Sequence, residues 1–122
     1  DREKWVPYLD ILMTHSVHGV VVANTIQTAE GGLSGHPLYD KAVEGVRIVK
    51  NYTKGNLVVV GVGGVSSPQR AYRMIQAGAS LVQLYTGLVY EGPMLVRRIN
   101  KGLKKIMEYK KISHISELMG GY

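Results

Sequence analysis

The sequence contains no cysteine among its 122 residues. Disulfide bonds, cysteine-ligated zinc and thiol chemistry are therefore excluded, and the absence fits a reducing compartment without establishing one. Phenylalanine is absent too, so the large apolar side chains are Leu, Ile, Val, Met, one Trp and eight Tyr. Long hydrophobic runs are also missing. The longest, such as Leu57–Val62, fall far short of the roughly 20 residues that span a bilayer, and the charged residues 1–4 are not typical of a signal peptide.

Basic residues outnumber acidic ones by 15 to 9, which gives a net charge of +6. Much of the positive charge lies late in the chain, at Arg97, Arg98, Lys101, Lys104, Lys105, Lys110 and Lys111. This run has helical spacing, with apolar residues on the opposite side, and predicts the solvated face of a terminal helix. We expect no nucleic-acid partner, because neither interleaved aromatics nor a known binding motif accompanies the charge. Steering of anionic substrates or contact with a membrane surface is a milder alternative.

Apolar residues alternate along the chain between helical spacing and short continuous runs. They predict helices at residues 3–14, 39–52, 68–76 and 93–109, and strands at residues 20–23, 57–60 and 80–84. Residues 24–37 form a polar, glycine-rich loop, and Ser66 or Ser67 can cap the third helix, with Pro68 in its first turn. Short apolar strands between helices indicate a parallel α/β sheet. The periodicity is compatible with an open sheet and with a closed barrel, although a whole (β/α)8 barrel takes about 250 residues.

Each predicted strand ends in small or polar residues. The three clusters are Asn24-Thr25, Gly63-Gly64 and Tyr85-Thr86-Gly87. Glycines after a strand let backbone N–H groups approach a phosphate, and a following helix adds the favourable end of its dipole. In (β/α)8 barrels, the loops after the last two strands frequently hold a phosphate. The second and third clusters therefore predict a phosphate site of the barrel kind, with simple tight turns as the alternative.

Three longer motifs carry a family resemblance: Gly31–Gly35 followed by Pro37-Leu38, Gly61–Ser67, and Ala77–Thr86 followed by Glu91-Gly92-Pro93. Together they resemble the dihydroorotate dehydrogenases, specifically the quinone-dependent class 2, over residues 17–122. The resemblance implies an α/β fold that is the C-terminal part of a (β/α)8 TIM barrel, with about three βα units. Residues 1–122 would then be the C-terminal portion of one FMN-binding domain, whose N-terminal half lies outside this chain.

The resemblance also implies an activity and a set of site residues. Family members use FMN to oxidise dihydroorotate to orotate in pyrimidine biosynthesis, and the class 2 enzymes pass the electrons to a quinone. Asn24 and Thr25 match the pair that binds the substrate. The matches to cofactor-binding residues are Ser34 and Gly35 against the flavin, and Gly63, Gly64, Tyr85 and Thr86 around the FMN phosphate. Ala23 departs from the family pattern, in which Thr is common, so a side-chain contact to flavin is lost there.

Other features of the family have no counterpart in this sequence. Its catalytic Ser, and a Lys that contacts the flavin, match positions before Asp1, so we expect no catalytic residue in this chain and no activity from this segment alone. Family members carry about ten more residues between Thr25 and Gly31. Either this connection is short in the protein, or residues are missing from the sequence at this point. We favour the second interpretation. We expect the segment to be stable only with the N-terminal half of the barrel, because its sheet edges would otherwise be exposed. Membrane association would come from a segment outside this chain, at the inner mitochondrial membrane in a eukaryote or the cytoplasmic membrane in a bacterium.

Two other functions stay open: another phosphate-binding barrel enzyme, and a non-catalytic fragment.

His15 and His18 lie three apart with no third ligand nearby, so we expect no metal site. His36 stands where the family often has Lys, and we expect it to face solvent. We expect Asp40 and Glu44, on one helix face, to be solvated or ion-paired. The tail at residues 113–120 resembles the short final helix of the family.

Overall fold

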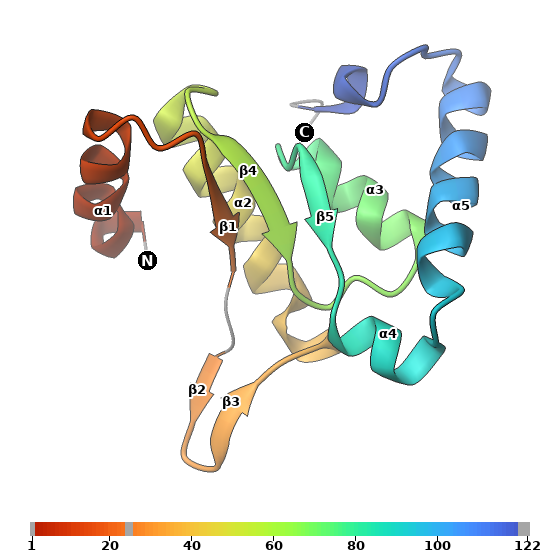
Figure 1. Cartoon of the computed structure of the whole chain (residues 1–122), viewed down its shortest axis with the longest axis horizontal. Coiled ribbons are helices and arrows are strands. Elements are labelled where there is room, and N and C mark those ends of the chain that lie inside the picture. Colours follow the sequence, from red (N-terminus) through yellow and green to blue (C-terminus); the bar gives the residue numbers. More distant parts are fainter. Residues whose placement is uncertain (1, 24–25, 120–122) are drawn as a thin grey trace.

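Three parallel strands and the helices between them form the body of the molecule (Figure 1). The computed structural model describes residues 2–23 and 26–119. The helices are α1 (Arg2–Thr14), α2 (Tyr39–Thr53), α3 (Pro68–Gln76), α4 (Thr86–Glu91) and α5 (Leu95–Lys110), with short 3-10 helices η1 (His36–Leu38) and η2 (Ile115–Leu118). The strands are β1 (Gly19–Val22), β2 (Ile26–Thr28), β3 (Gly31–Leu33), β4 (Val58–Val62) and β5 (Leu81–Gln83). The predicted alternation of four helices with three strands is confirmed, with further short elements inserted into it.

The main sheet has the order β1-β4-β5, so strands that follow one another in the α/β alternation are also neighbours in space. In its register, Val21 lies opposite Val60, and Val60 lies opposite Leu81. Partners across a parallel sheet point to the same face, and successive residues of a strand alternate between faces. Val21, Val60 and Leu81 therefore form a row across one face of the sheet.

The opposite face of the sheet carries the core. Helices α2 and α3 pack against it, and lie behind the sheet in Figure 1. The buried side chains that meet there come from both layers: Val22, Val59, Ala42, Val43, Val46, Val49, Ala71 and Met74. The run of β-branched residues in β1 and β4 suits a strand packed in this way. These contacts hold the carboxyl ends of the strands in place.

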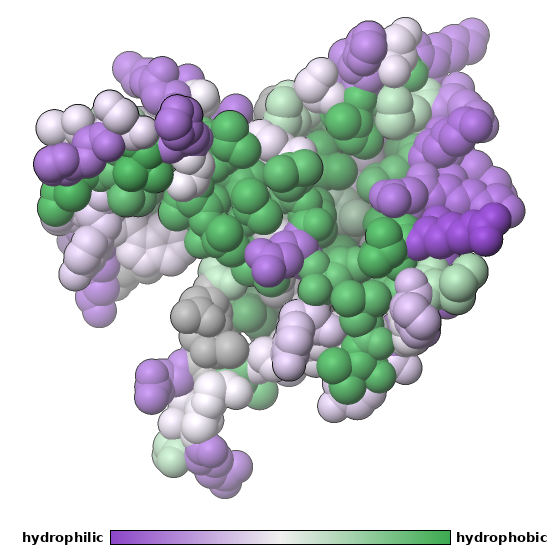
Figure 2. All heavy atoms as spheres, in the orientation of Figure 1, coloured by the Kyte–Doolittle hydropathy of each residue, from purple (hydrophilic) through white to green (hydrophobic). Residues whose placement is uncertain are grey.

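No helix among the described residues covers the face that carries the Val21–Val60–Leu81 row. Figure 2 shows hydrophobic atoms gathered over β1, β4 and β5 on this side of the molecule. Val21 is 57% exposed and Leu81 is 62% exposed. A continuous apolar surface of this kind is unusual for a free-standing soluble domain and indicates a surface that another part of a protein covers.

The outer helices pack on this layer from two sides. Trp5 of α1 lies against Gly45 of α2, where an added Cβ would come within 2.8 Å of the Trp5 ring. The Tyr52 hydroxyl donates a hydrogen bond of 2.7 Å to Asp10, and this bond raises the pKa of Tyr52 above its ordinary value. Helix α5 packs on α3. Of the helices that the structure describes, none is long and apolar enough to cross a membrane.

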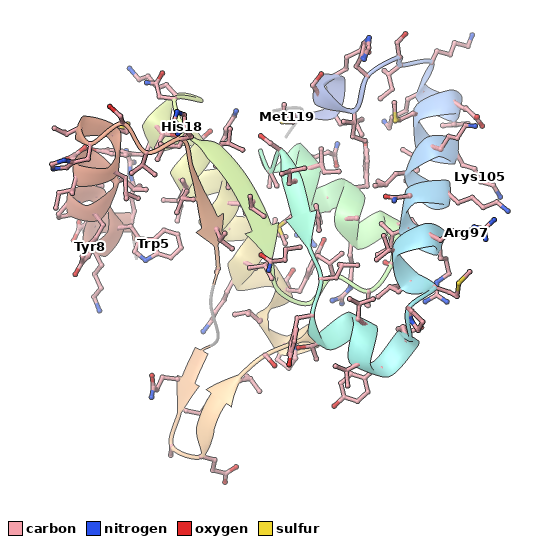
Figure 3. All side chains as sticks on the ribbon, in the orientation of Figure 1. Trp5, Tyr8, His18, Arg97, Lys105 and Met119 are labelled. Carbon is pink, nitrogen blue, oxygen red and sulfur yellow. The ribbon has the colours of Figure 1, made fainter. Side chains whose placement is uncertain are left out.

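The late cluster of basic residues lies on the outer side of α5, as predicted. Arg97 and Lys105 extend away from the molecule in Figure 3. Arg98 forms an ion pair of 2.7 Å with Glu91, and Lys104 lies 3.9 Å from Glu108. The solvated-face interpretation of this helix is therefore confirmed.

Two elements differ from the sequence prediction. Part of the expected loop at residues 24–37 is an antiparallel hairpin, in which β2 pairs with β3 and the Thr28 hydroxyl donates to the Gly31 carbonyl at 2.7 Å. A further short helix, α4, precedes α5. The strands are three residues long, β3 is exposed throughout, and α4 buries no residue. Neither element therefore produces the apolar periodicity on which the prediction depended.

The cap of α3 is Ser67, one of the two serines that the sequence offers. Its hydroxyl accepts a hydrogen bond from the Arg70 N–H at 3.3 Å. We expect Ser67→Ala to lower the free energy of unfolding by about 1 kcal/mol, because one N–H of the first turn loses its acceptor. Urea denaturation of the complete protein measures this, with Ser66→Ala as the matched control. Equal losses for the two variants would contradict the assignment of the cap.

Candidate functional site

A cleft opens where the carboxyl ends of β4 and β5 meet the segment between β3 and η1. Its volume is about 420 Å³. It is lined by all six of the predicted cofactor-binding residues, Ser34, Gly35, Gly63, Gly64, Tyr85 and Thr86. In parallel α/β proteins, ligands bind at this edge of the sheet. The three segments come from distant parts of the sequence, and the sheet register brings them together.

The Gly63-Gly64 turn requires glycine at both positions. Its φ angles are 128° at Gly63 and 66° at Gly64, a region that residues with a Cβ rarely adopt. A Cβ on Gly64 would lie 2.7 Å from the Gly35 carbonyl oxygen and 2.7 Å from the Tyr39 Cβ. The turn after β4 is therefore in direct contact with the segment that precedes η1.

The backbone donors of this turn are available to a ligand. Within residues 2–23 and 26–119, neither the Gly63 N–H nor the Gly64 N–H donates to a backbone or side-chain acceptor. Gly63 is nevertheless buried. Buried N–H groups in folded proteins almost always have a hydrogen-bond acceptor. The N–H groups of this turn are therefore suited to donate to an acceptor on a ligand.

Two hydroxyl groups complete the polar wall of the cleft. Ser34 Oγ lies 3.2 Å from Thr86 Oγ1, so one hydroxyl donates to the other and the second keeps its proton for another acceptor. Gly35, with φ of 78°, lets the two segments approach, because a Cβ there would lie 2.9 Å from Thr86 Cγ2. Backbone N–H groups and hydroxyls form a donor set that suits a phosphate group.

Other predicted residues lie in different settings. Ala23 is half-buried and lines the cleft, and its N–H donates to the Val62 carbonyl at 3.1 Å. Asn24 and Thr25, the predicted substrate pair, lie outside the described residues. Tyr85 lines the cleft and is 77% exposed.

The charged residues predicted to be solvated behave as expected. Asp40 forms an exposed ion pair with Arg73 at 3.3 Å, and Glu44 pairs with Arg47. His36 is exposed, as predicted. None of these side chains lines the cleft.

One residue beside the site was missed by the sequence analysis. Arg70 donates from Nη1 to the Gly64 carbonyl at 2.8 Å. Its only signal in the sequence is its position three residues after the Ser67 cap, which places it in the first turn of α3. No motif marks Arg70, because its partner is a backbone carbonyl. Every residue has a backbone carbonyl, so no residue type in the sequence signals this contact.

Comparison with known protein families gives one match that spans most of the chain. A model of the dihydroorotate dehydrogenase family matches residues 10–107. The dihydroorotate dehydrogenase (quinone) of Crocosphaera subtropica is 44% identical over 97 residues, which cover 80% of this chain and 26% of that protein. The enzyme of the same name from Nostoc punctiforme is 36% identical over 137 residues, covering 95% of this chain and 36% of the relative. The chain therefore spans between about a quarter and a little over a third of these relatives.

Solved structures give the same result for the fold. The crystal structure of dihydroorotate dehydrogenase from Eimeria tenella in complex with ferulenol superimposes with a TM-score of 0.89 and 28% identity. The overlap covers 98% of this chain and 35% of that one. A ligand-free structure from the same organism gives a TM-score of 0.85 and 29% identity. The prediction of a partial (β/α)8 barrel built from about three strand units is confirmed.

Proposed function

Because the chain belongs to the dihydroorotate dehydrogenase family, we propose that it works as part of a complete barrel that oxidises dihydroorotate to orotate. In this proposal the chain is the C-terminal portion of one FMN-binding domain, and the remainder of that barrel is its partner. The electrons pass to a quinone, as the names of the relatives suggest. The reaction serves pyrimidine biosynthesis.

The observation that carries the proposal is the convergence of six predicted residues in one cleft at the carboxyl edge of the sheet. The N–H groups of Gly63 and Gly64, which have no acceptor within the described residues, fit the phosphate of FMN, together with the hydroxyl of Thr86 and with Tyr85, which lines the same cleft. Ser34 and Gly35 lie beside Thr86 and Gly64 in the same cleft, where they would contact the flavin. FMN, when bound, supplies a ring system that takes up two electrons from the substrate.

The remaining parts of the machinery are assigned by family resemblance. Asn24 and Thr25 would hydrogen-bond the pyrimidine ring, since amide and hydroxyl groups both donate and accept. The proton acceptor and a flavin-contacting lysine would come from the rest of the barrel, so this segment alone would be inactive. Membrane attachment, at the inner mitochondrial membrane or the bacterial cytoplasmic membrane according to the source, would also lie outside this chain.

The visible absorption spectrum of the complete purified protein tests the proposal. We expect flavin bands that bleach when dihydroorotate is added under anaerobic conditions and return when a soluble quinone is added. Orotate should form in an amount equal to the bleached flavin. A colourless protein that cannot be reconstituted with FMN would contradict the proposal and favour a barrel enzyme with a phosphorylated substrate.

A further inference from the structure

Arg70 joins three separate segments beside the glycine turn. Its Nη1 donates to the Gly64 carbonyl at 2.8 Å, and its Nη2 lies 2.9 Å from Nδ1 of His36. The guanidinium carbon also lies over the Tyr39 ring, 4.4 Å from the ring centroid. These contacts tie the start of α3 to the turn after β4, to η1 and to the first residue of α2.

The directions of these hydrogen bonds follow from the donors available. A guanidinium has only donors, so His36 Nδ1 must be the acceptor in this contact. The Tyr39 hydroxyl donates in return to the Arg70 backbone carbonyl at 2.9 Å. Arg70 is half-buried and Tyr39 is buried. The two residues are therefore in contact twice, through the guanidinium over the ring and through the hydroxyl at the backbone carbonyl.

The bond to Gly64 restricts the orientation of the peptide unit between Gly64 and Val65. Glycine has wider conformational freedom than any other residue, and a ligand that needs one orientation must restrict it on binding. Since a trans peptide is planar, holding the Gly64 carbonyl also fixes the direction of the Val65 N–H. Arg70 thus holds the turn in one orientation before any ligand arrives.

We propose that Arg70 is a positioning residue for the phosphate cradle, acting through its hydrogen bonds to the Gly64 carbonyl and to His36. The inference rests on the proposed function, because it assumes that Gly63 and Gly64 receive the FMN phosphate. Arg70 acts by preorganisation, so its removal weakens binding of the phosphate without weakening binding of the flavin ring.

Arg73 offers a matched control for this proposal. It lies one turn further along α3, carries the same charge and has its guanidinium carbon 5.8 Å from the same Tyr39 ring. Its ion pair, however, is with the exposed carboxylate of Asp40. Comparing Arg70→Met with Arg73→Met therefore separates loss of the bond to the glycine turn from loss of positive charge near Tyr39.

The test compares FMN with riboflavin, which lacks the phosphate, by quenching of flavin fluorescence on the complete apoprotein. We expect Arg70→Met to raise the dissociation constant for FMN about tenfold, with riboflavin changed by less than about twofold. Arg73→Met should leave both affinities within about twofold of wild type. Arg70→Lys should not restore FMN binding, because an ammonium lacks the fork that reaches two acceptors.

Each alternative result has a distinct meaning. Full rescue by lysine would show that charge alone matters and would overturn the positioning role. An equal loss for FMN and riboflavin, or a fall of more than about 5 °C in the melting temperature of the Arg70→Met apoprotein, would indicate a general structural role instead. Failure of the wild-type protein to bind FMN would refute the proposed function itself, whatever the variants do.

Discussion

Replacing Gly64 with alanine is expected to weaken FMN binding by the complete protein about 100-fold. Two costs combine at this position. A left-handed backbone costs an L-residue about 1–2 kcal/mol, and the new Cβ would lie 2.7 Å from the Gly35 carbonyl oxygen and from the Tyr39 Cβ. Backbone atoms move with difficulty, so the turn itself must shift. A shift that removes two charge-assisted hydrogen bonds to phosphate accounts for a loss of about 3 kcal/mol.

Gly92 provides the control for the effect of backbone strain. Its φ is 81°, and a Cβ there would have no neighbour within 4 Å. Gly92→Ala therefore introduces strain at a positive φ without overlap, and it lies at the end of α4, outside the cleft. We expect the FMN affinity of the Gly92→Ala variant, measured by fluorescence quenching, to stay within about threefold of wild type. Wild-type affinity in Gly64→Ala would show that the turn does not hold the phosphate.

The sequence was sufficient to predict the alternation of helices and strands, because each buried strand is a short β-branched run and each large helix has one apolar face. It also predicted which segments form the cleft. Gly63 and Gly64 could be identified because glycines directly after a strand allow the backbone to approach a phosphate. Ser34 and Thr86 could be identified because they lie within family motifs. The structure brings these residues together, while their binding of FMN stays a prediction.

The parts that were missed depend on contacts that have no local pattern. The hairpin of β2 and β3 is held by backbone pairing, its strands are three residues long and β3 is exposed throughout, so it carries no periodic signal. Ser67 rather than Ser66 is the cap because its hydroxyl accepts from the Arg70 N–H, a contact that two adjacent serines in a sequence do not distinguish. Arg70 acts on a carbonyl six residues earlier and on His36 in another segment. Such interactions become visible only when the chain is folded.

The uncovered face of the sheet gives the second prediction of large effect. Leu81 is 62% exposed here, in the same row as Val21 and Val60. In a closed barrel, this face turns inward and packs against side chains from the other strands. We therefore expect Leu81→Asp to destabilise the complete protein by about 3 kcal/mol or more, because a carboxylate would be buried without a partner.

Tyr109 is the control for this substitution, because it is 88% exposed on α5 and gains the same carboxylate in Tyr109→Asp. That variant should unfold within about 0.5 kcal/mol of wild type in urea. If Leu81→Asp matched it, the row at Val21, Val60 and Leu81 would be open to water in the complete protein, and this chain could not be one part of a closed barrel. A large loss confined to Leu81→Asp means that the rest of the barrel covers the sheet. The same surface then explains why the segment should be stable only with its other half, since that half removes the apolar row from water.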